Sequence, residues 1–571
     1  MSERKPLSRR QFLRGALVGV SAAAAPVLIS ACGGAPSAVQ PTIAPAAEAP
    51  AGEAPAAEPE APAPAAPVDV TLLTSGWPLT PMPTAEDIAA DPARQGYAEA
   101  LQTWMDANPG VTIEQIEADI WDQQAVVTAI SGGTAPIWVF ATSIGGWTLA
   151  GARAAFVQGL MADVTTYVDQ YDYRNRLTDI AKSGWEQQAS VDGRYFSTPL
   201  DAGINGTIFY RRDLIRELGL EEPKPSWTWA DFRALAKALT SPQDNRRGFG
   251  AQATFVGSML NDYGFDLLTQ IPAPETSWNW RRDFSNPQWA QAVATYRAMI
   301  FEDQSVLTDT TLNNDGVLKA FTDGTIAMTS QNILSAFGSA ASEDSIAALA
   351  QRLGKPYQEV VGFASRPRGE NGHFVGGVYV GGVSYSPDAT PETLQKAVDV
   401  VDYMFLGKGW DIQKAGQYAA TQDLQAVFNY PIPIDGKYTY EGVPGTFVDA
   451  WGQETLDAAQ RIASIPLAPD PGLYFPAENN PGPDTQAIDD AWSTFSTVAE
   501  GVDVAATLQQ AQDTWNTQAQ GFSSSVADEE FVEGARAYYA DVEAFWQQNS
   551  PQFYEDAFKP WYESTVKPAL G

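Results

Sequence analysis

Aromatic and polar side chains follow three segments that we predict to be strands near the start of the folded part of the chain. They are Trp77 after strand 68–73, Asp119 and Trp121 after strand 111–116, and Ser143 after strand 137–141. An indole ring offers a flat apolar face, and carboxylate and hydroxyl oxygens form hydrogen bonds. This combination suits a neutral solute with many hydroxyl groups, such as a sugar. An organic cation enclosed by aromatic rings is the alternative ligand.

Further candidate ligand-binding residues lie in the second half of the chain. They are Asp201 shortly after Pro199, Gln331 and Asn332 after a strand at 326–329, and Gly377 and Tyr379 in a Gly-rich strand at 376–386. A glycine such as Gly377 would let a ligand approach the backbone closely. We predict these residues to bind a ligand, and we predict no catalytic residue, metal ligand or cofactor.

The elements that must position these side chains alternate between strand and helix. After the first strand, the spacing of apolar residues predicts helices at 94–107 and 123–131, on either side of strand 111–116. Such alternation indicates an α/β unit with a parallel sheet, in which groups beyond the carboxyl ends of the strands come together. A second unit begins after Pro199, with a strand at 207–210 and a helix that Thr228 caps. Later helices are predicted at 287–301, at 315–321, and from Pro391 onward.

The scarcity of cysteine and histidine and the absence of several motifs exclude some classes of protein. Cys32 is the only cysteine and His373 the only histidine, so an internal disulfide and a zinc site of the usual ligands are excluded by number. The serine-hydrolase, zinc-protease and nucleotide-binding motifs are absent. A Ser-His-Asp triad would have to use His373, which we expect in an exposed turn. A glycosidase needs only two carboxylates, so this enzyme class stays open, whereas an adhesion scaffold would show repeats that this chain lacks.

The charge of the chain excludes two classes of partner. It carries 35 basic and 69 acidic residues, a net charge of −34. A surface of this sign repels nucleic acid and anionic membranes. We expect a monomer whose ligand is a small solute.

The first residues read as an export signal. Arg9 and Arg10 precede an apolar run from Ala16 to Ile29, a pattern typical of a twin-arginine signal and too short for a durable membrane span. Residues 1–32 end in Ile-Ser-Ala-Cys, which resembles a lipobox and predicts lipidation of Cys32. Residues 33–67, rich in Ala and Pro, predict a disordered linker. We expect an exported protein, lipid-anchored at the outer face of the cytoplasmic membrane.

Several motifs in sequence order resemble the extracellular solute-binding proteins of sugar ABC importers, the group that includes maltose-binding protein. The motifs are Asn-Pro-Gly-Val-Thr-Ile at 108–113, Gly-Gly-Thr-Ala-Pro at 132–136, Tyr-Phe-Ser-Thr-Pro-Leu-Asp at 195–201, Thr-Ile-Phe-Tyr at 207–210, Pro-Ser-Trp-Thr-Trp-Ala-Asp-Phe at 225–232, Phe-Ser-Asn-Pro at 284–287 and Ala-Phe-Thr-Asp-Gly-Thr-Ile-Ala-Met at 320–328. The resemblance implies a periplasmic-binding-protein-like fold of type II, with hinge crossings between two α/β lobes. It also implies ligand capture in the cleft, closure of the lobes and delivery to an ABC permease. Asp201 stands at the hinge crossing, where the family has an acidic residue that contacts the ligand.

This resemblance implies a division of the chain into segments. We expect lobe one at 68–198, lobe two at 199–330, a return to lobe one at 331–375, a return to lobe two at 376–525, and a helical extension at 526–571. Two regions depart from the family pattern. Residues 244–283 contain Trp278 and Trp280, which we expect to pack this region. The tail carries an apolar helical face from Phe531 to Phe545, which predicts a packing extension, with a docking element for a partner as the alternative.

Overall fold

The computed structural model divides the chain into one unit at residues 1–65 and a second at 66–571. It describes residues 69–571 except 147–148, 205–206, 251–258, 310–311, 313, 332–344, 430–432, 476–485 and 525. The predicted export signal, Cys32 and the linker lie outside the described residues. Among the residues described, no helix has both the length and the apolar character to cross a bilayer.

The first lobe begins with two parallel strands, β1 (Val70–Thr74) and β2 (Val111–Gln115), in the register Val70 to Val111. The helices α3 (Arg94–Ala107) and α4 (Gln123–Ser131) have the predicted bounds. The N–H of Ile137 donates to the carbonyl of Leu73 at 2.8 Å, which places β3 (Trp138–Val139) beside β1. β3 is shorter than predicted because the chain turns at Phe140 into the helix α5 (Ala141–Ile144).

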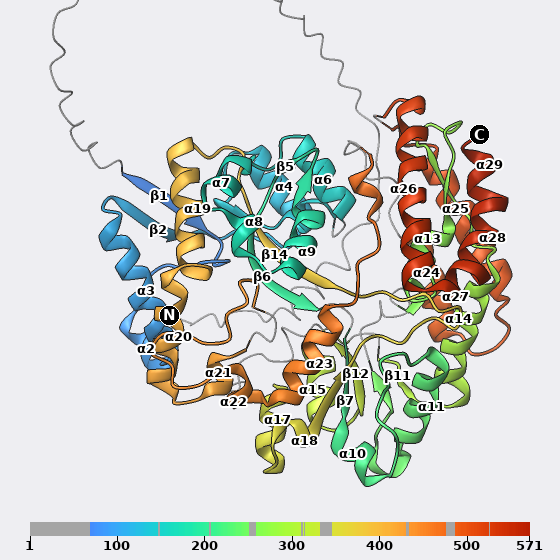
Figure 1. Cartoon of the computed structure of the whole chain (residues 1–571), viewed down its shortest axis with the longest axis horizontal. Coiled ribbons are helices and arrows are strands. Elements are labelled where there is room, and N and C mark those ends of the chain that lie inside the picture. The colour runs from blue at the N-terminus through green and yellow to red at the C-terminus, as the bar shows by residue number, and fades with distance from the viewer. Residues whose placement is uncertain are drawn as a thin grey trace, which may run out of the picture. The chain divides into compact units, whose positions relative to one another are not determined.

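The rest of this lobe comes from two distant parts of the chain. The strand β14 (Val378–Tyr385) runs antiparallel between β3 and β6 (Thr198–Ile204), so this sheet is mixed rather than wholly parallel. The helices α19 (Pro391–Phe405) and α20 (Lys408–Thr421) lie beside α3 and β1 (Figure 1). Gly96 and Gly416 allow α3 and α20 to approach closely, since a Cβ on Gly96 would lie 2.4 Å from the carbonyl oxygen of Gln413.

The second lobe is built on a five-stranded sheet. Its strands, in spatial order, are β11 (Val306–Leu307), β8 (Phe249–Gly250), β12 (Met328–Gln331), β7 (Thr207–Arg211) and β13 (Val361–Ala364). The helix α11 (Trp229–Leu239) begins with the predicted cap, in which Thr228 and Asp231 bond each other's backbone N–H groups. Buried aromatic rings fill the core around Trp229 and Trp289, and Trp138 is buried in the first lobe.

The strand pairing differs from the expected division into lobes. Residues 361–364 were expected in lobe one, but β13 pairs with β7 in the second sheet. Residues 378–421, expected in lobe two, supply β14, α19 and α20 to the first lobe. The reason is that all four residues of β13 are buried and apolar or glycine, so their sequence carries no signal for which sheet they join. The chain returns to the second lobe with α24 (Gln486–Thr497) and α25 (Val504–Ala519), which pack beside α14 (Pro287–Arg297).

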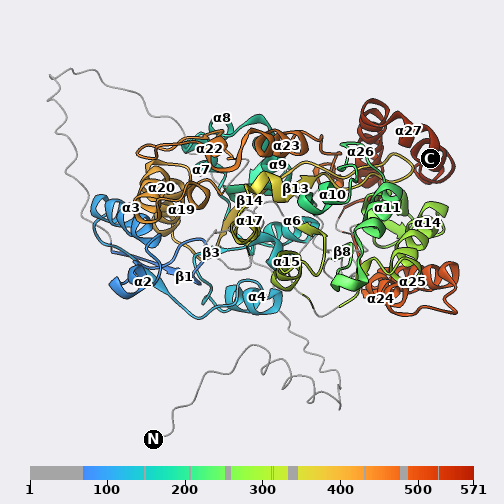
Figure 2. The same cartoon turned by 90° about the horizontal axis from the view of Figure 1, so that it is seen from below.

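The tail and the departing region pack on each other. The tail consists of α26 (Asp528–Asn549), α27 (Pro551–Phe553), α28 (Lys559–Trp561) and α29 (Lys567–Ala569), joined through π-helical turns at 554–558 and 562–566. The ring of Phe531 in α26 lies 4.9 Å from that of Trp280 in the hairpin of β9 (Gln270–Pro272) and β10 (Trp280–Arg282). In Figures 1 and 2 these tail helices lie at the opposite end of the folded unit from β1, β2 and α3.

The position of His373 corrects one expectation. We expected an exposed turn, yet His373 is only 6% exposed. Its ring lies 4.5 Å from Trp546 and 4.6 Å from Phe553, and the hydroxyl of Ser550 donates to the carbonyl of Gly372 at 2.8 Å. Burial lowers the pKa of His373 to about 3. The tail therefore covers this turn, and the cover comes from residues about 170 positions further along the sequence.

Candidate functional site

Three aromatic rings meet at the strand ends of the first lobe. Trp77 follows β1, Trp121 follows β2 and Phe140 follows β3, and their ring centroids lie 5.1 to 5.6 Å apart. Trp121 is 43% exposed. A carboxylate oxygen of Asp119 accepts the backbone N–H of Trp121 at 2.9 Å, so Asp119 shapes the turn that presents this indole. The predicted Trp77 and Trp121 thus form one aromatic cluster with Phe140, which was not among the predicted ligand-binding residues.

A cavity of about 160 Å³ opens beside this cluster; we call it the Trp410 cavity. Its aromatic and polar lining includes Trp77, Asp201, Trp410, Asp435 and Tyr440. Lys414, one turn after Trp410 in α20, places its Nζ 4.4 Å from the centre of the Trp410 ring and donates to the Asn429 side chain at 3.0 Å. Burial lowers the pKa of Lys414 to about 7.

A second cavity, of about 310 Å³, lies on the same lobe; we call it the Tyr379 cavity. Its lining combines aromatic rings with short polar side chains, including Phe140, Thr142, Gln188, Ser197 and Tyr379. Phe140 lines this cavity and contacts Trp77, which lines the other. The two cavities therefore share the aromatic cluster as a common wall.

Asp201 stands where the linings of the two cavities meet. It lies on β6 opposite Gly381 of β14, and a Cβ on Gly381 would lie 2.2 Å from its Oδ1. This oxygen is buried and accepts no hydrogen bond from the residues that the structure describes. Burial raises the pKa of Asp201 to about 6, against a smaller opposing effect of the Gly381 N–H. A buried carboxylate oxygen without a donor is costly, so a hydroxyl or other donor placed there would be held firmly.

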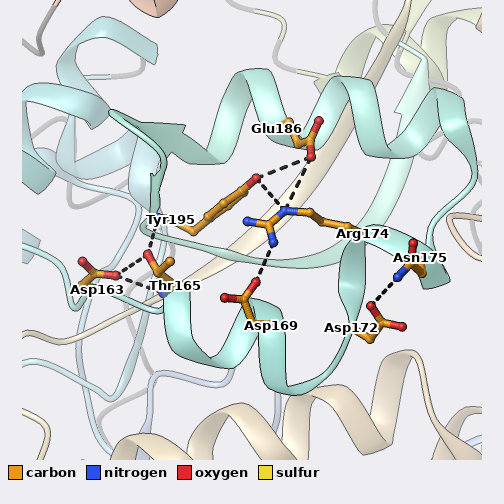
Figure 3. A network of polar contacts seen from close by, with 8 residues as sticks. All are labelled: Asp163, Thr165, Asp169, Asp172, Arg174, Asn175, Glu186 and Tyr195. Atoms are coloured by element: carbon orange, nitrogen blue, oxygen red, sulfur yellow. Dashed lines mark hydrogen bonds and ion pairs between the residues drawn. The ribbon is translucent and has the colours of Figure 1, made fainter.

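A polar network holds the strand that leads into β6. Figure 3 shows Arg174 of α8 (Tyr173–Arg176) between Asp169, Glu186 and Tyr195. Its Nη1 donates to Asp169 at 2.6 Å, and its guanidinium lies 5.0 Å over the Tyr195 ring. The backbone N–H of Tyr195 donates to the hydroxyl of Thr165 at 2.9 Å. These contacts tie β5 (Arg194–Tyr195) to α7 (Thr165–Gln170), α8 and α9 (Asp179–Ala189), and so fix the approach to Asp201.

Two of the predicted residues have structural roles here. Ser143 is fully buried, and its hydroxyl lies 2.5 Å from the carbonyl of Ile120 and 2.8 Å from that of Phe140. It thereby joins the turns that carry the aromatic cluster. Gly377 has φ +100°, and a Cβ there would lie 2.2 Å from Leu467, so the group that approaches its backbone is a side chain of this chain.

The remaining predicted residues lie partly or wholly outside the described residues. The backbone of Gln331 pairs with Thr207 at the end of β12, while its side chain is not among those described. Asn332 lies outside the described residues altogether.

The sequence reasoning missed Trp410, Asp435, Tyr440 and Gln188. None of them follows a predicted strand; they lie on α20, in the turns after α21 (Leu424–Val427) and on α9. The cluster of aromatic residues between 403 and 440 was the available signal. Within the described part of the chain, no three His, Cys, Asp or Glu side chains come together as metal ligands.

The chain forms two α/β lobes joined by the β6–β7 and β13–β14 crossings. Aromatic and acidic cavities lie beside a crossing strand. This architecture is that of a two-lobed binding protein. The chain matches the family described as bacterial extracellular solute-binding protein over residues 76–409, more than half of its length, and belongs to that family.

Solved structures of similar fold include several binding proteins of ABC transporters. Maltose-bound MalE3 of T. maritima has a TM-score of 0.53 and 15% identity, covering 78% of this chain and 99% of its own. A solute-binding protein of Agrobacterium radiobacter in complex with ribitol has a TM-score of 0.51 and 16% identity, covering 75% and 96%. The maltose/maltodextrin-binding domain MalE of Bdellovibrio bacteriovorus, bound to maltotriose, has a TM-score of 0.50 and 16% identity, covering 79% and 99%. No curated protein matches the chain significantly.

Proposed function

We propose that this protein captures a sugar or sugar alcohol at the Trp410 and Tyr379 cavities and delivers it to an ABC permease. The single observation that carries the proposal is the buried Asp201 oxygen, which accepts no hydrogen bond from the part of the chain that the structure describes, set beside Trp77, Trp410 and Tyr379. Aromatic rings pack on the apolar faces of a sugar, and a carboxylate accepts its hydroxyl protons. The similar structures in complex with maltose, ribitol and maltotriose support this ligand class.

Each predicted residue has a proposed part in this function. Trp77 and Trp121 act as platforms for sugar rings, and Asp201 accepts hydroxyl hydrogen bonds. Asp119, Ser143 and Gly377 position the site rather than touch the ligand. Gln331, Asn332 and Tyr379 contribute polar contacts on closure of the lobes.

The cellular setting forms part of the same proposal. The family is extracellular, which fits the export signal at residues 1–32. Lipidation of Cys32, with residues 33–67 as a tether, would keep the binding unit near its permease. We infer that it works as a monomer, and its closed, loaded form is the one that the permease recognises.

An organic cation is the second candidate ligand, because the Trp410 cavity joins aromatic rings to two carboxylates. Two observations favour the sugar instead. Asp435 is paired with Lys437 at 3.4 Å, which neutralises one of the carboxylates. The Nζ of Lys414 already occupies one side of the Trp410 ring, and its protonated form would repel a second cation on this ring.

A titration screen tests the proposal. Residues 66–571 are titrated in a calorimeter with maltose, maltotriose, ribitol, mannitol and choline. We expect saturable binding of a sugar or polyol, which Asp201→Asn and Trp77→Ala weaken. Trp561→Ala, a partly exposed tryptophan of the tail, is the matched control and should bind as the parent does. Binding of choline alone would favour the cation, and cleavage of an oligosaccharide would favour an enzyme.

A further inference from the structure

A third cavity, of about 330 Å³, lies on the second lobe; we call it the arginine cavity. Its walls come from the loop after α10 (Arg212–Glu217), from β13 and the residues that follow it, and from one face of α23 (Gln453–Ala463). It shares no residue with the Trp410 cavity or the Tyr379 cavity. It is therefore separate from the proposed sugar site.

The charge of the arginine cavity is opposite to that of the chain. Its cationic lining residues are Arg212, Lys224, Arg366, Arg368 and Arg461, and its acidic ones are Glu222 and Glu454. The whole chain carries 35 basic and 69 acidic residues. Such a local reversal of sign attracts anions to this cavity.

Three of these cations are already paired with carboxylates. Arg212 lies 2.9 Å from Glu222 and 2.8 Å from Glu454. Lys224 lies 2.8 Å from Glu221, and Arg366 lies 2.9 Å from the buried Asp262. These pairs shape the cavity and leave two cations to consider.

Arg368 and Arg461 make no side-chain hydrogen bond or ion pair with any residue that the structure describes. The Arg368 guanidinium is half-buried and lies 5.0 Å over the ring of Phe374. Arg461 stands in the last turn of α23. A guanidinium offers five donors in a planar fork that matches a carboxylate or a sulfate. Two such groups without acceptors can hold two anionic oxygen groups.

Most of the remaining wall of the arginine cavity is apolar, with Tyr210 and Ser365 as its polar members. The apolar part includes Phe363, Phe374, Val375, Ala458, Ile462 and Ile465. A bare inorganic anion would leave this surface in contact with water, whereas an anion on an apolar body would cover it. We propose that the arginine cavity is a second ligand site, which binds a small organic anion such as an aromatic dicarboxylate, with Arg368 and Arg461 holding its charged groups.

Calorimetric titration of residues 66–571 with benzene-1,3-dicarboxylate tests this proposal. We expect one-to-one binding, and about tenfold weaker binding in Arg368→Gln and in Arg461→Gln, since each loses a charge-assisted hydrogen bond. Arg281→Gln, at an exposed arginine of β10 outside the cavity, is the matched control and should keep the parent affinity. Neutral benzamide should not bind measurably.

Three results would overturn the proposal: no saturable binding, equal affinity in all variants, or binding only of an aspartate-rich peptide, which would assign the cavity to a protein partner. Arg461→Gln keeps the test valid if Arg368→Gln fails to fold, because Arg461 is exposed. The inference does not rest on the sugar site, and sugar titration of the same variants should give the parent affinity.

Discussion

The Trp410 cavity and the arginine cavity show two ways in which one chain prepares a surface for a ligand. The first offers aromatic rings and a carboxylate oxygen that accepts no hydrogen bond from the described residues. The second offers guanidinium groups for which the described residues supply no acceptor, beside a mainly apolar wall. In both, we propose that this group selects the complementary ligand: a hydroxyl donor for Asp201, an anion for Arg368 and Arg461. The net charge of −34 would have predicted neither location, because binding depends on local rather than total charge.

The largest expected effect is that of a substitution in the tail, which should weaken binding at the arginine cavity but not at the Trp410 cavity. Trp546→Ala removes a buried ring that packs 5.1 Å from Phe374, which lines the arginine cavity. We expect a loss of about 3–5 kcal/mol in the free energy of unfolding, as for other buried tryptophans, and weaker anion binding. Denaturant unfolding and titration at a temperature where the variant stays folded measure both. Weakened sugar binding in this variant would contradict the independence of the cavities.

The next effect concerns Asp201 alone. Asp201→Asn should weaken sugar binding about 10- to 100-fold through the loss of charged hydrogen bonds, and leave anion binding unchanged. The pKa of Asp201 is raised to about 6, so the folded state binds a proton more readily than the unfolded state. Stability of the parent should therefore fall as pH rises from about 4 to 6, and this dependence should shrink in the variant. Thermal unfolding at several pH values measures it; an unchanged slope would show that Asp201 is not buried as described.

A smaller effect concerns the cation behind the Trp410 ring. The pKa of Lys414 is lowered to about 7, so between pH 7 and its ordinary value the unfolded state binds more protons than the folded state. Stability should rise by about 1 kcal/mol from pH 7 to 8 through this group, and Lys414→Met should remove that rise. Lys396→Met, a lysine that bonds Asn108 at the surface of the same lobe, is the control. Urea unfolding at the two pH values compares them.

The smallest effect is the response to salt. Raising the ionic strength from 50 to 500 mM should weaken anion binding several-fold, because screening shortens the reach of the arginine charges. Sugar binding should change less than twofold, since no net charge is neutralised. Titration of each ligand at both salt concentrations measures the two changes in affinity. An equal response of the two ligands would remove the electrostatic distinction between the cavities.

Local sequence signals predicted several of the longer helices and the strands β1, β2, β3, β7, β12 and β14, but not β6 or β13. The helices α3 and α4 match their predicted ranges because apolar spacing and end signals such as Asn108-Pro109-Gly110 act within a few residues. The lobe of β13 was predicted wrongly because its pairing with β7 joins residues about 150 positions apart. His373 was predicted wrongly for the same reason, since its covering ring, Trp546, lies in the distant tail.

The residues of the candidate site that directly follow a strand could be predicted from the sequence. Trp77 and Trp121 come together because strand ends meet at one edge of a sheet, and Asp201 lines the same cavity as Trp77 from within β6. Trp410 and Tyr440 were missed because they enter the same cavity from a helix and a turn, where no rule of strand order applies. Ser143 has the expected position but bonds two backbone carbonyls, which sequence alone cannot distinguish from a ligand contact.

The two crossings between the lobes differ in length, and this has a mechanical consequence. Two residues separate β6 from β7, whereas residues 365–377 separate β13 from β14. The longer crossing is clasped by the tail at Gly372 and His373. The short connection keeps the two lobes close at one point, whereas the long connection is held in place by its contacts with the tail. A rotation of one lobe relative to the other would therefore also act on the contacts between the tail and the long connection.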